Sequence, residues 1–281
     1  MKRINKILIP VAAIILASGC QKMKEPALGT YPADSNPPGG PLEFYVAFDG
    51  ATANTAMNAV DSTRANFPID NPLVSTDGVN GKGVQGEAQK FIKYSKPNSW
   101  AAKSKSFTIS FWYKKDGQTK NNVGGNGPEH VLALKSSNGH WSGAQLLVFL
   151  EGDNAAGAVK VMIADATNAD NWFTWEGGNT IPGLLDNNWH HVALVYSNAT
   201  STMTLYIDGT ANSNTRSWGT HGDINIDKDA ITELRIGAGP GTGYDTDDWL
   251  TSSFKGSLDQ VRMYSTDISV SEIQSLFVNK Q

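Results

Sequence analysis

Two acidic runs have the residue types that could cut a glycosidic bond. Such chemistry needs two carboxylates about 5–9.5 Å apart, on either side of the bond. Glu151 and Asp153 have the alternate spacing that places side chains on one face of a strand. Gly152 and Asn154 beside them are turn residues and indicate a loop. The second run, DTDD at residues 245–248, lies in a Gly-rich segment without periodicity, so neither run predicts a catalytic pair.

Adjacent histidines and a glycine-rich loop are the next candidates. His190 and His191 lie in a strand-like run, where neighbouring side chains point to opposite faces and cannot hold one metal ion. No HExxH pattern accompanies them, and we expect one core histidine and one packing residue. The loop GAGPGTG at residues 237–243 precedes no helix, and Pro240 lacks the N–H that a phosphate would need. Nucleotide binding is therefore not predicted.

Aromatic side chains in polar segments are the best candidates for a binding surface. Indole and phenol rings can stack on the apolar C–H face of a sugar, while polar neighbours bond its hydroxyl groups. Four such residues lie in polar or Gly-rich stretches: Trp141, Trp218, Tyr244 and Trp249. Each could instead be a lid over the end of the core, and the sequence leaves both interpretations open.

Other tryptophans lie inside strand-like runs. Trp112 and Trp189 have apolar neighbours, and we expect both in the core. Trp172 and Trp175 fall on opposite faces of one short strand, so at most one of them is exposed.

The element that must position these side chains is a hairpin at residues 188–209. Trp189–Tyr196 and Met203–Asp208 are rich in β-branched and aromatic residues, as strands require. A polar loop of hairpin length separates them, and Asp208-Gly209 supplies a tight turn. Both runs carry apolar residues on both faces. We therefore expect this hairpin in the middle of a large sheet, covered on each side.

Strand-like segments recur along the rest of residues 42–281, separated by Gly, Asn and Asp. This pattern is typical of a single antiparallel all-β domain. The segments are Leu42–Phe48, a short pair within Gly83–Tyr94, Phe107–Lys114, Val131–Leu134, Leu146–Leu150, Val159–Ala164, Trp172–Trp175, Ile231–Ile236 and Leu258–Tyr264.

One helix is predicted at the C-terminus. Ser269 and Glu272 form a capping-box pattern, with Ser269 at the N-cap. Ile273, Leu276 and Phe277 share one face of this helix. We expect it to close an open edge or end of the sandwich.

The first 19 residues have the pattern of an export signal. A basic start is followed by an apolar stretch at residues 7–17, too short for a comfortable membrane span. The next residues, LASGC, resemble the lipobox of bacterial lipoproteins, which implies that Cys20 is lipidated and becomes the new N-terminus. The alternative is an ordinary secretory peptide with an incidental cysteine. Residues 20–41 are rich in Pro and Gly and are predicted to be a tether.

Composition narrows the partners. Cys20 is the only cysteine, so the exported domain has no internal disulfide. The net charge is −4, with the basic residues scattered, and nucleic acid is not an expected partner.

Several short motifs in order resemble the LamG-like jelly-roll family, within the concanavalin A-like lectin/glucanase fold. The resemblance covers residues 42–281 and implies an all-β, two-sheet antiparallel jelly-roll sandwich with one short C-terminal helix. It implies ligands on the concave face or at loop ends, but the fold hosts binders, enzymes and spacers alike. The motifs are FDG at 48–50, GKGV at 81–84, FTISFW at 107–112, WHHVA at 189–193, LYIDG at 205–209, FKGSLDQVR at 254–262 and SEI at 271–273.

The resemblance also implies a structural calcium ion. Members of the family often hold Ca²⁺ between the first strand and the last hairpin, and the matching carboxylates are Asp49 and Asp259. Calcium takes about six to eight oxygen ligands, so backbone carbonyls and a helper such as Asp61 or Asn80 must join them. The alternative is that Asp49 caps a turn and Asp259 pairs with Arg262.

These features together predict a non-catalytic carbohydrate-binding lipoprotein at the bacterial cell surface. It would be held at the outer membrane by its lipid, assist polysaccharide capture and work with an outer-membrane transport complex. One alternative is a protein-interaction or adhesion module without glycan binding. The other is a glycoside hydrolase or lyase on the same fold, although the glucanase pattern Glu-x-Asp-x-Glu lacks its third carboxylate after Glu151 and Asp153.

Overall fold

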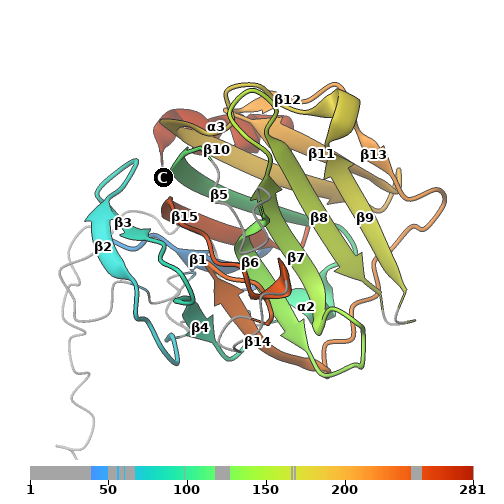
Figure 1. Ribbon diagram of the computed structural model, residues 1–281. Helices are drawn as coiled ribbons and strands as arrows, with labels where there is room; N and C mark the ends of the chain where they lie inside the picture. Colours follow the sequence, from blue (N-terminus) through green and yellow to red (C-terminus); the bar gives the residue numbers. More distant parts are fainter. Residues whose placement is uncertain are drawn as a thin grey trace, which may run out of the picture. The chain divides into compact units, whose positions relative to one another are not determined.

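The computed structural model describes residues 39–49, 56, 60, 67–97, 99–117, 127–165, 167, 169–241 and 249–280 (Figure 1). Cys20, the predicted export signal and almost all of the predicted tether lie outside these residues, as do Tyr244 and the acidic run at 245–248. The side chain of Trp249 is also outside the description. Among the described residues no helix is long and apolar enough to cross a membrane.

One layer is an antiparallel sheet of nine described strands. β1 (Leu42–Val46) pairs with β15, and β13 (Arg216–Ser217) pairs with β11. The other strands lie in the order β12 (Thr210–Ala211), β11 (Thr202–Ile207), β10 (Asp186–Ser197), β5 (Phe107–Asp116), β15 (Ser257–Tyr264), β3 (Lys82–Gln85) and β2 (Val74–Asp77).

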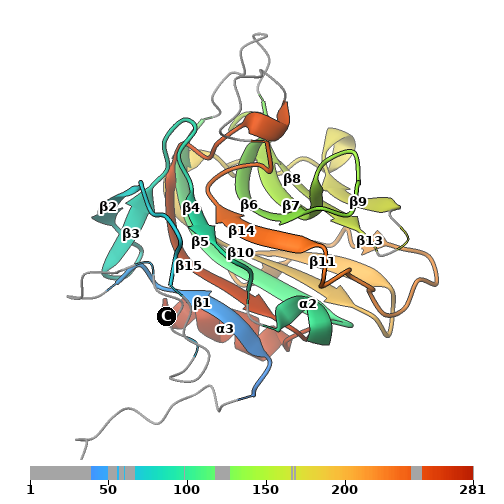
Figure 2. The same ribbon diagram turned by 90° about the horizontal axis from the view of Figure 1, so that it is seen from below.

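The second layer is an antiparallel sheet of six described strands. It covers one face of the nine-stranded sheet, as Figures 1 and 2 show. The predicted two-sheet antiparallel jelly-roll sandwich is confirmed. The strand order is β4 (Ile92–Tyr94), β14 (Ile231–Ile236), β6 (Glu129–Ser136), β7 (Ala144–Glu151), β8 (Ala158–Ala164) and β9 (Asp170–Trp175).

The core lies between the two sheets and is built by strand alternation. Phe107, Ile109 and Phe111 of β5 point inward, and Leu146 and Val148 of β7 meet them from the other sheet. All five side chains are fully buried. Burial of each such side chain contributes about 1.5–3 kcal/mol, so this layer fixes the two sheets as one rigid support.

The C-terminal helix α3 (Val270–Asn279) begins with the predicted capping box. The backbone N–H of Glu272 donates to Ser269 Oγ over 3.3 Å, and Ser269 N–H donates to Glu272 Oε2 over 2.8 Å. The sequence suggested that this helix closes an edge or an end of the sandwich, but it does not. Its Ile273 packs with Val195 of β10 and Tyr206 of β11, on the outer face of the nine-stranded sheet (Figure 2).

The predicted central hairpin is β10–β11, paired from Val192–Ile207 to Ser197–Thr202. Its apolar outer face explains the position of α3, because that face would otherwise meet water. Trp112 is buried as predicted and stacks on Phe277 of α3, with ring centroids 5.7 Å apart. Trp189 is only partly buried, contrary to the prediction, because β10 is irregular between Asp186 and Trp189.

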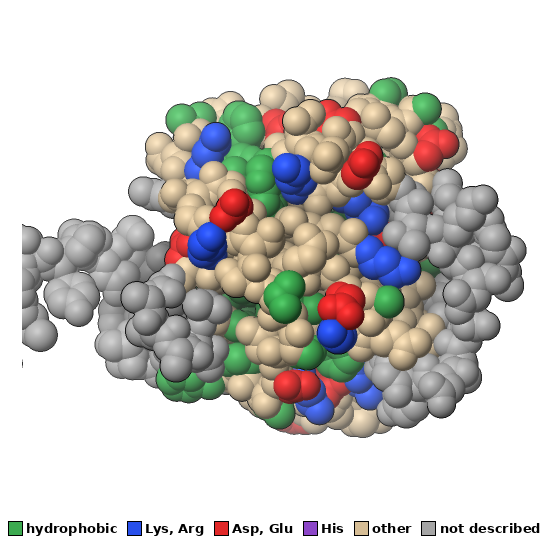
Figure 3. All heavy atoms as spheres, turned by 60° about the vertical axis from the view of Figure 1, so that its left-hand side comes forward, with side chains coloured by type: hydrophobic (Ala, Val, Ile, Leu, Met, Phe, Trp, Pro, Cys, Tyr) green, Lys and Arg blue, Asp and Glu red, His purple; other side chains and the backbone are tan. Residues whose placement is uncertain are grey.

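Short helical segments complete the described fold: α2 (Trp100–Lys103), η1 (Gly177–Asn179) and η2 (Trp249–Thr251). On the face in Figure 3, Lys and Arg side chains are mixed with Asp and Glu rather than gathered in one basic patch.

A buried ion pair joins the two sheets. Lys115 Nζ of β5 lies 2.6 Å from Glu129 Oε2 of β6, and both side chains are almost fully buried. Replacing Lys115 with Met should lower the free energy of unfolding by about 3–5 kcal/mol, because it leaves the carboxylate buried without its counter-ion. Urea denaturation measures this loss. The double variant K115M/E129L should recover most of it, and a loss below about 1 kcal/mol in the single variant would contradict a buried charged pair.

Candidate functional site

The outer face of the six-stranded sheet presents an apolar row that ends in an exposed tryptophan. Leu147 of β7 is opposite Met162 of β8, and Met162 is opposite Trp172 of β9. Phe149 meets the Trp172 ring edge-on, with centroids 6.1 Å apart. Leu147, Met162 and Phe149 are buried, whereas Trp172 keeps 37% of its surface exposed. The ring therefore packs against buried side chains and stays partly exposed to solvent.

Trp141 joins Trp172 across a shared carboxylate. It lies in the turn between β6 and β7 and is 56% exposed. Its indole N–H donates to Asp170 Oδ2 over 3.1 Å, and the indole N–H of Trp172 donates to the same oxygen over 3.1 Å. Both rings are thus tied at their polar edges, and each side chain keeps part of its surface exposed to solvent. We call Trp141, Asp170 and Trp172 the tryptophan site.

His140 fixes the turn that carries Trp141. Its Nδ1 lies 2.7 Å from Ser142 Oγ, and its ring lies 5.4 Å from that of Trp141. Burial lowers the pKa of His140, although Asp170 opposes this shift. The imidazole is therefore a neutral support for the turn at neutral pH.

A lysine holds two carboxylates one row further along the same face. Lys160 of β8 is opposite Thr174, two residues from Trp172 on β9. Its Nζ lies 2.7 Å from Glu151 Oε2 and 2.6 Å from Glu176 Oε2. Burial works to lower the pKa of Lys160, but hydrogen bonds to both carboxylates raise it overall. The group is a closed ion triad beside the tryptophan site.

This triad does not provide the acid that glycoside hydrolysis requires. A general acid needs a raised pKa, but the hydrogen bond from Lys160 lowers the pKa of Glu176. The sequence indicated that Glu151 lies in a loop, but it is the last residue of β7. Asp153 lies in the loop, where its Oδ1 accepts the N–H groups of Ala155 and Ala156. Glu151 and Asp153 therefore have structural partners.

Trp218, another predicted binding residue, lies against the core. Trp218 is partly buried against the main core, and its ring stacks face to face on His221 with centroids 3.7 Å apart. It also meets the rings of Phe173 and Tyr196 edge-on. This is the lid alternative, so Trp218 does not share the open site of Trp141.

Sequence reasoning did not assign Trp172 to the site, although it allowed one exposed residue in the Trp172–Trp175 pair. That expectation is confirmed, since Trp175 is fully buried. The signal for Trp172 was strand alternation. The local sequence does not predict the strand register that places Trp172 and Trp141 on the same carboxylate, Asp170.

The two histidines diverge, as alternation requires. His191 is a core histidine, fully buried, with Nε2 2.8 Å from Ser110 Oγ. His190 is more than the packing residue that we expected. Its Nδ1 lies 2.8 Å from Asp208 Oδ2 and its Nε2 2.9 Å from Asp186 Oδ1. The hydrogen bond to Asp208, aided by Asp186, raises the pKa of His190.

The carboxylates matched to calcium accept hydrogen bonds from the first residue of β3 and from the turn before it. Lys82 N–H donates to Asp49 Oδ1 over 2.6 Å, and Val79 N–H donates to Asp259 Oδ2 over 2.9 Å. Gly81 lies so close to Asp49 that a Cβ there would clash with the carboxylate. The alternative partner of Asp259 has other contacts. Arg262 donates to the carbonyl of Gln260 over 3.1 Å and lies over the Tyr45 ring.

The chemistry of this pair fits a hard cation. Asp259 Oδ1 is buried and accepts no hydrogen bond from the described residues. Burial raises the pKa of Asp259 to about 7, and the nearby Asp49 adds to the increase. Oxygen ligands of this kind suit Ca²⁺. The described chain contains no group of three or more His, Cys, Asp or Glu suited to a metal, so carbonyl oxygens would have to complete the shell.

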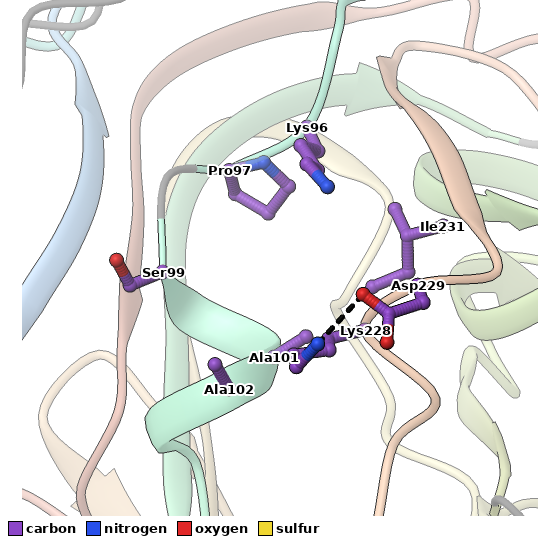
Figure 4. A pocket seen from close by; sticks show the side chains of 8 residues that line it. All are labelled: Lys96, Pro97, Ser99, Ala101, Ala102, Lys228, Asp229 and Ile231. Carbon is purple, nitrogen blue, oxygen red and sulfur yellow. Dashed lines mark hydrogen bonds and ion pairs between the residues drawn. The ribbon is translucent and has the colours of Figure 1, made fainter.

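A small hollow beside α2 has a different character (Figure 4). Its volume is about 200 Å³, and Lys228 and Asp229 at its rim form an ion pair of 2.6 Å. No tryptophan lines it. The lining residues are Lys96, Pro97, Ser99, Ala101, Ala102, Lys228, Asp229 and Ile231.

Comparison with known proteins agrees with this architecture. Residues 87–274 match the family Laminin_G_3, described as the concanavalin A-like lectin/glucanases superfamily. The match covers more than half of the sequence, and the chain belongs to this family of LamG-like domains. No curated protein matches it.

Solved structures share the fold at low sequence identity. The binding domain of botulinum neurotoxin serotype G superposes with a TM-score of 0.59 at 12% identity, covering 85% of this chain and 51% of the toxin domain. The binding domain of botulinum neurotoxin DC, solved with SialylT, gives 0.55 at 12% identity, with coverages of 86% and 51%. The chain thus spans about half the length of these toxin domains.

A bacterial enzyme module is similar along nearly its whole length. Domain 4 of AbnA, a GH43 extracellular arabinanase from Geobacillus stearothermophilus, was solved in complex with arabinotriose. It gives a TM-score of 0.53 at 15% identity, covering 84% of this chain and 97% of the domain. At these identities the likeness concerns the fold.

Proposed function

We propose that this chain is a non-catalytic carbohydrate-binding protein that captures polysaccharide at the tryptophan site. The observation that carries the proposal is the exposed pair Trp141 and Trp172, both hydrogen-bonded to Asp170 Oδ2. The ring of Trp172 is packed against the sheet, and that of Trp141 is tied to Asp170, so little side-chain freedom is lost when a sugar ring stacks on them. Asp170 is placed to accept a hydrogen bond from a sugar hydroxyl.

The comparisons support this choice of ligand class. Domain 4 of the arabinanase was solved with arabinotriose, so a domain of this fold and nearly this length holds a neutral sugar chain. The toxin structures are binding domains, one of them solved with SialylT. The ion triad of Glu151, Lys160 and Glu176 supports binding without catalysis, because both carboxylates are held by the same ammonium and the pKa of Glu176 is lowered.

We further propose that the domain works at the outer membrane of a bacterium. The support is the lipobox-like sequence that ends at Cys20, together with the Pro- and Gly-rich residues that follow it. Lipid attachment would leave the domain at the cell surface, where captured polysaccharide could pass to an outer-membrane transport complex. Palmitate labelling of the cells, with Cys20→Ala as the control, tests the anchor.

The binding proposal is tested with a glycan array followed by isothermal titration calorimetry. Neutral plant and microbial polysaccharides are the probes, with arabinan among them. We expect saturable binding to at least one class and no release of reducing ends from it. Binding to proteins but to no glycan would support the adhesion alternative, and new reducing ends would support the hydrolase.

We also propose that calcium braces the sandwich through Asp49 and Asp259, with backbone carbonyls completing the shell. The ion would give the buried Asp259 Oδ1 a positively charged partner, where the described residues give it no hydrogen bond. At a calcium concentration 100 times its Kd, binding stabilises the fold by about 2.7 kcal/mol. For a domain of this size the melting temperature should rise by about 5–10 °C.

Differential scanning calorimetry with calcium and with EDTA measures this shift. Asp259→Asn should remove the response to calcium, while Asp153→Asn, in a loop on the other sheet, should keep it. Identical melting temperatures with calcium and with EDTA in the unaltered chain would remove the calcium proposal.

A further inference from the structure

We infer that the tryptophan site selects neutral glycans and rejects glycans that carry carboxylates. This inference rests on the proposed function and names the class of ligand. It follows from the fixed charges on both sides of Trp172 along β9.

The first charge is Asp170, between the two indoles. Because both N–H groups donate to one of its oxygens, the carboxylate is held between the two indole N–H groups. About a third of its side chain, 31%, stays exposed to solvent. A sugar stacked on either ring therefore lies beside a negative charge that can accept from hydroxyl groups but repels another carboxylate.

The second charge is the ion triad on the other side of Trp172. Lys160 lies one row along the sheet, and its single ammonium serves both Glu151 and Glu176. One positive charge and two negative charges leave a net negative group. Glu176 is 47% exposed, so this charge faces the solvent in which a longer glycan would extend.

Neighbouring cationic groups are committed to other partners. Arg216 Nε donates to the carbonyl of Thr174 over 2.6 Å, and its guanidinium lies over Trp175 on the inner side of β9. His140 is neutral at neutral pH because burial lowers its pKa; its Nδ1 lies 2.7 Å from Ser142 Oγ and its Nε2 lies 3.8 Å from Asp170 Oδ2. Among the described residues around the site, the ammonium of Lys160 is closest in sequence register to Trp172, and two carboxylates hold it. Among the residues that the structure describes here, a uronic or sialic acid would find like charge and a cation that two carboxylates already hold.

Titration with two sets of oligosaccharides of equal length tests this inference. The neutral probes are arabino-, xylo- and gluco-oligosaccharides, and the anionic probes are oligogalacturonides and sialylated oligosaccharides. We expect the best neutral probe to bind at least tenfold more tightly than any anionic probe at low salt. Raising the salt concentration should narrow this gap, because salt screens repulsion between exposed charges. Equal or tighter anionic binding would overturn the inference and leave the binding proposal intact, whereas no binding of any probe would overturn both.

A double variant tests the role of the triad. E151Q/E176Q removes both negative charges and releases the ammonium of Lys160. The measured quantity is the ratio of the dissociation constants for the anionic and neutral probes, which should fall at least tenfold. The matched control is D77N/E87Q, which releases Lys82 and Lys90 from exposed pairs of 2.7 and 2.8 Å near β2 and β3. The control should keep the ratio of the unaltered chain, and the same ratio in E151Q/E176Q would overturn the inference.

Discussion

Replacing Trp172 with alanine is expected to weaken polysaccharide binding about 30-fold, or about 2 kcal/mol, as for an aromatic residue at the centre of a binding surface. The substitution removes the stacking face and one of the two indole N–H groups that hold Asp170. Trp141 then loses part of its support through the shared carboxylate. Isothermal titration calorimetry with the best glycan from the array measures the loss.

Two controls separate stacking from folding in this experiment. Trp172→Phe keeps a ring without the N–H and should lose less affinity than the alanine variant. Phe67→Ala removes an aromatic ring that is more exposed than Trp172, 59% compared with 37%, from the segment before β2, and should bind like the unaltered chain. An unchanged affinity in Trp172→Ala, with an unchanged melting temperature, would place the ligand elsewhere.

Acid should destabilise the fold through two buried histidines. Burial lowers the pKa of His130 and of His191 to about 3, compared with about 6.5 in an unfolded chain. Between these values the unfolded chain binds protons that the folded chain does not, so stability falls as the pH decreases from about 6.5 towards 3. At pH 5 each histidine should lower the free energy of unfolding by about 2 kcal/mol.

The pKa of His190 shifts in the opposite direction, and this shift does not cancel the loss of stability in acid. Its pKa is raised by Asp208 and Asp186, so its contribution is complete below about pH 6.5 and is lost as the pH rises through its folded pKa. It therefore lowers stability on the alkaline side. Asp259 opposes the acid effect, because its pKa is raised to about 7 and the folded chain therefore holds a proton that the unfolded chain releases above about pH 4. His130 and His191 together outweigh this single group, so the net effect of acid is a loss of stability.

Urea denaturation at several pH values isolates one of the two buried histidines. His191→Gln keeps a hydrogen-bonding side chain next to Ser110 but has no proton to gain. The slope of unfolding free energy against pH, between about pH 6 and 4.5, should be smaller by about 1.4 kcal/mol per pH unit than in the unaltered chain. Equal slopes in both proteins would show that His191 already takes up a proton in the folded state.

The fold was predictable from local sequence because its strands are long and apolar. β14 has the bounds expected for Ile231–Ile236, and the capping box of α3 begins at Ser269 as expected. β2 (Val74–Asp77) was missed because its side chains are polar or exposed and it lies at a sheet edge. The predicted position of α3 was wrong. The helix packs on the apolar outer face of β10–β11 because this buries more apolar surface than an open edge would.

The site was less predictable because it depends on long-range register. Trp141 was singled out by its polar neighbours, which do not identify its partner. Asp170 and Trp172 meet it only because β7, β8 and β9 pair in the observed register. The same limit applies to Trp218, whose polar neighbours concealed its stacking on His221 and its contact with the core.

A structure of the chain with a bound oligosaccharide tests the central claim most directly. We expect a sugar ring parallel to the indole of Trp141 or Trp172, with a hydroxyl group hydrogen-bonded to Asp170. A sugar bound on another surface, with both indoles still open to solvent, would contradict the claim that this tryptophan pair is the binding site.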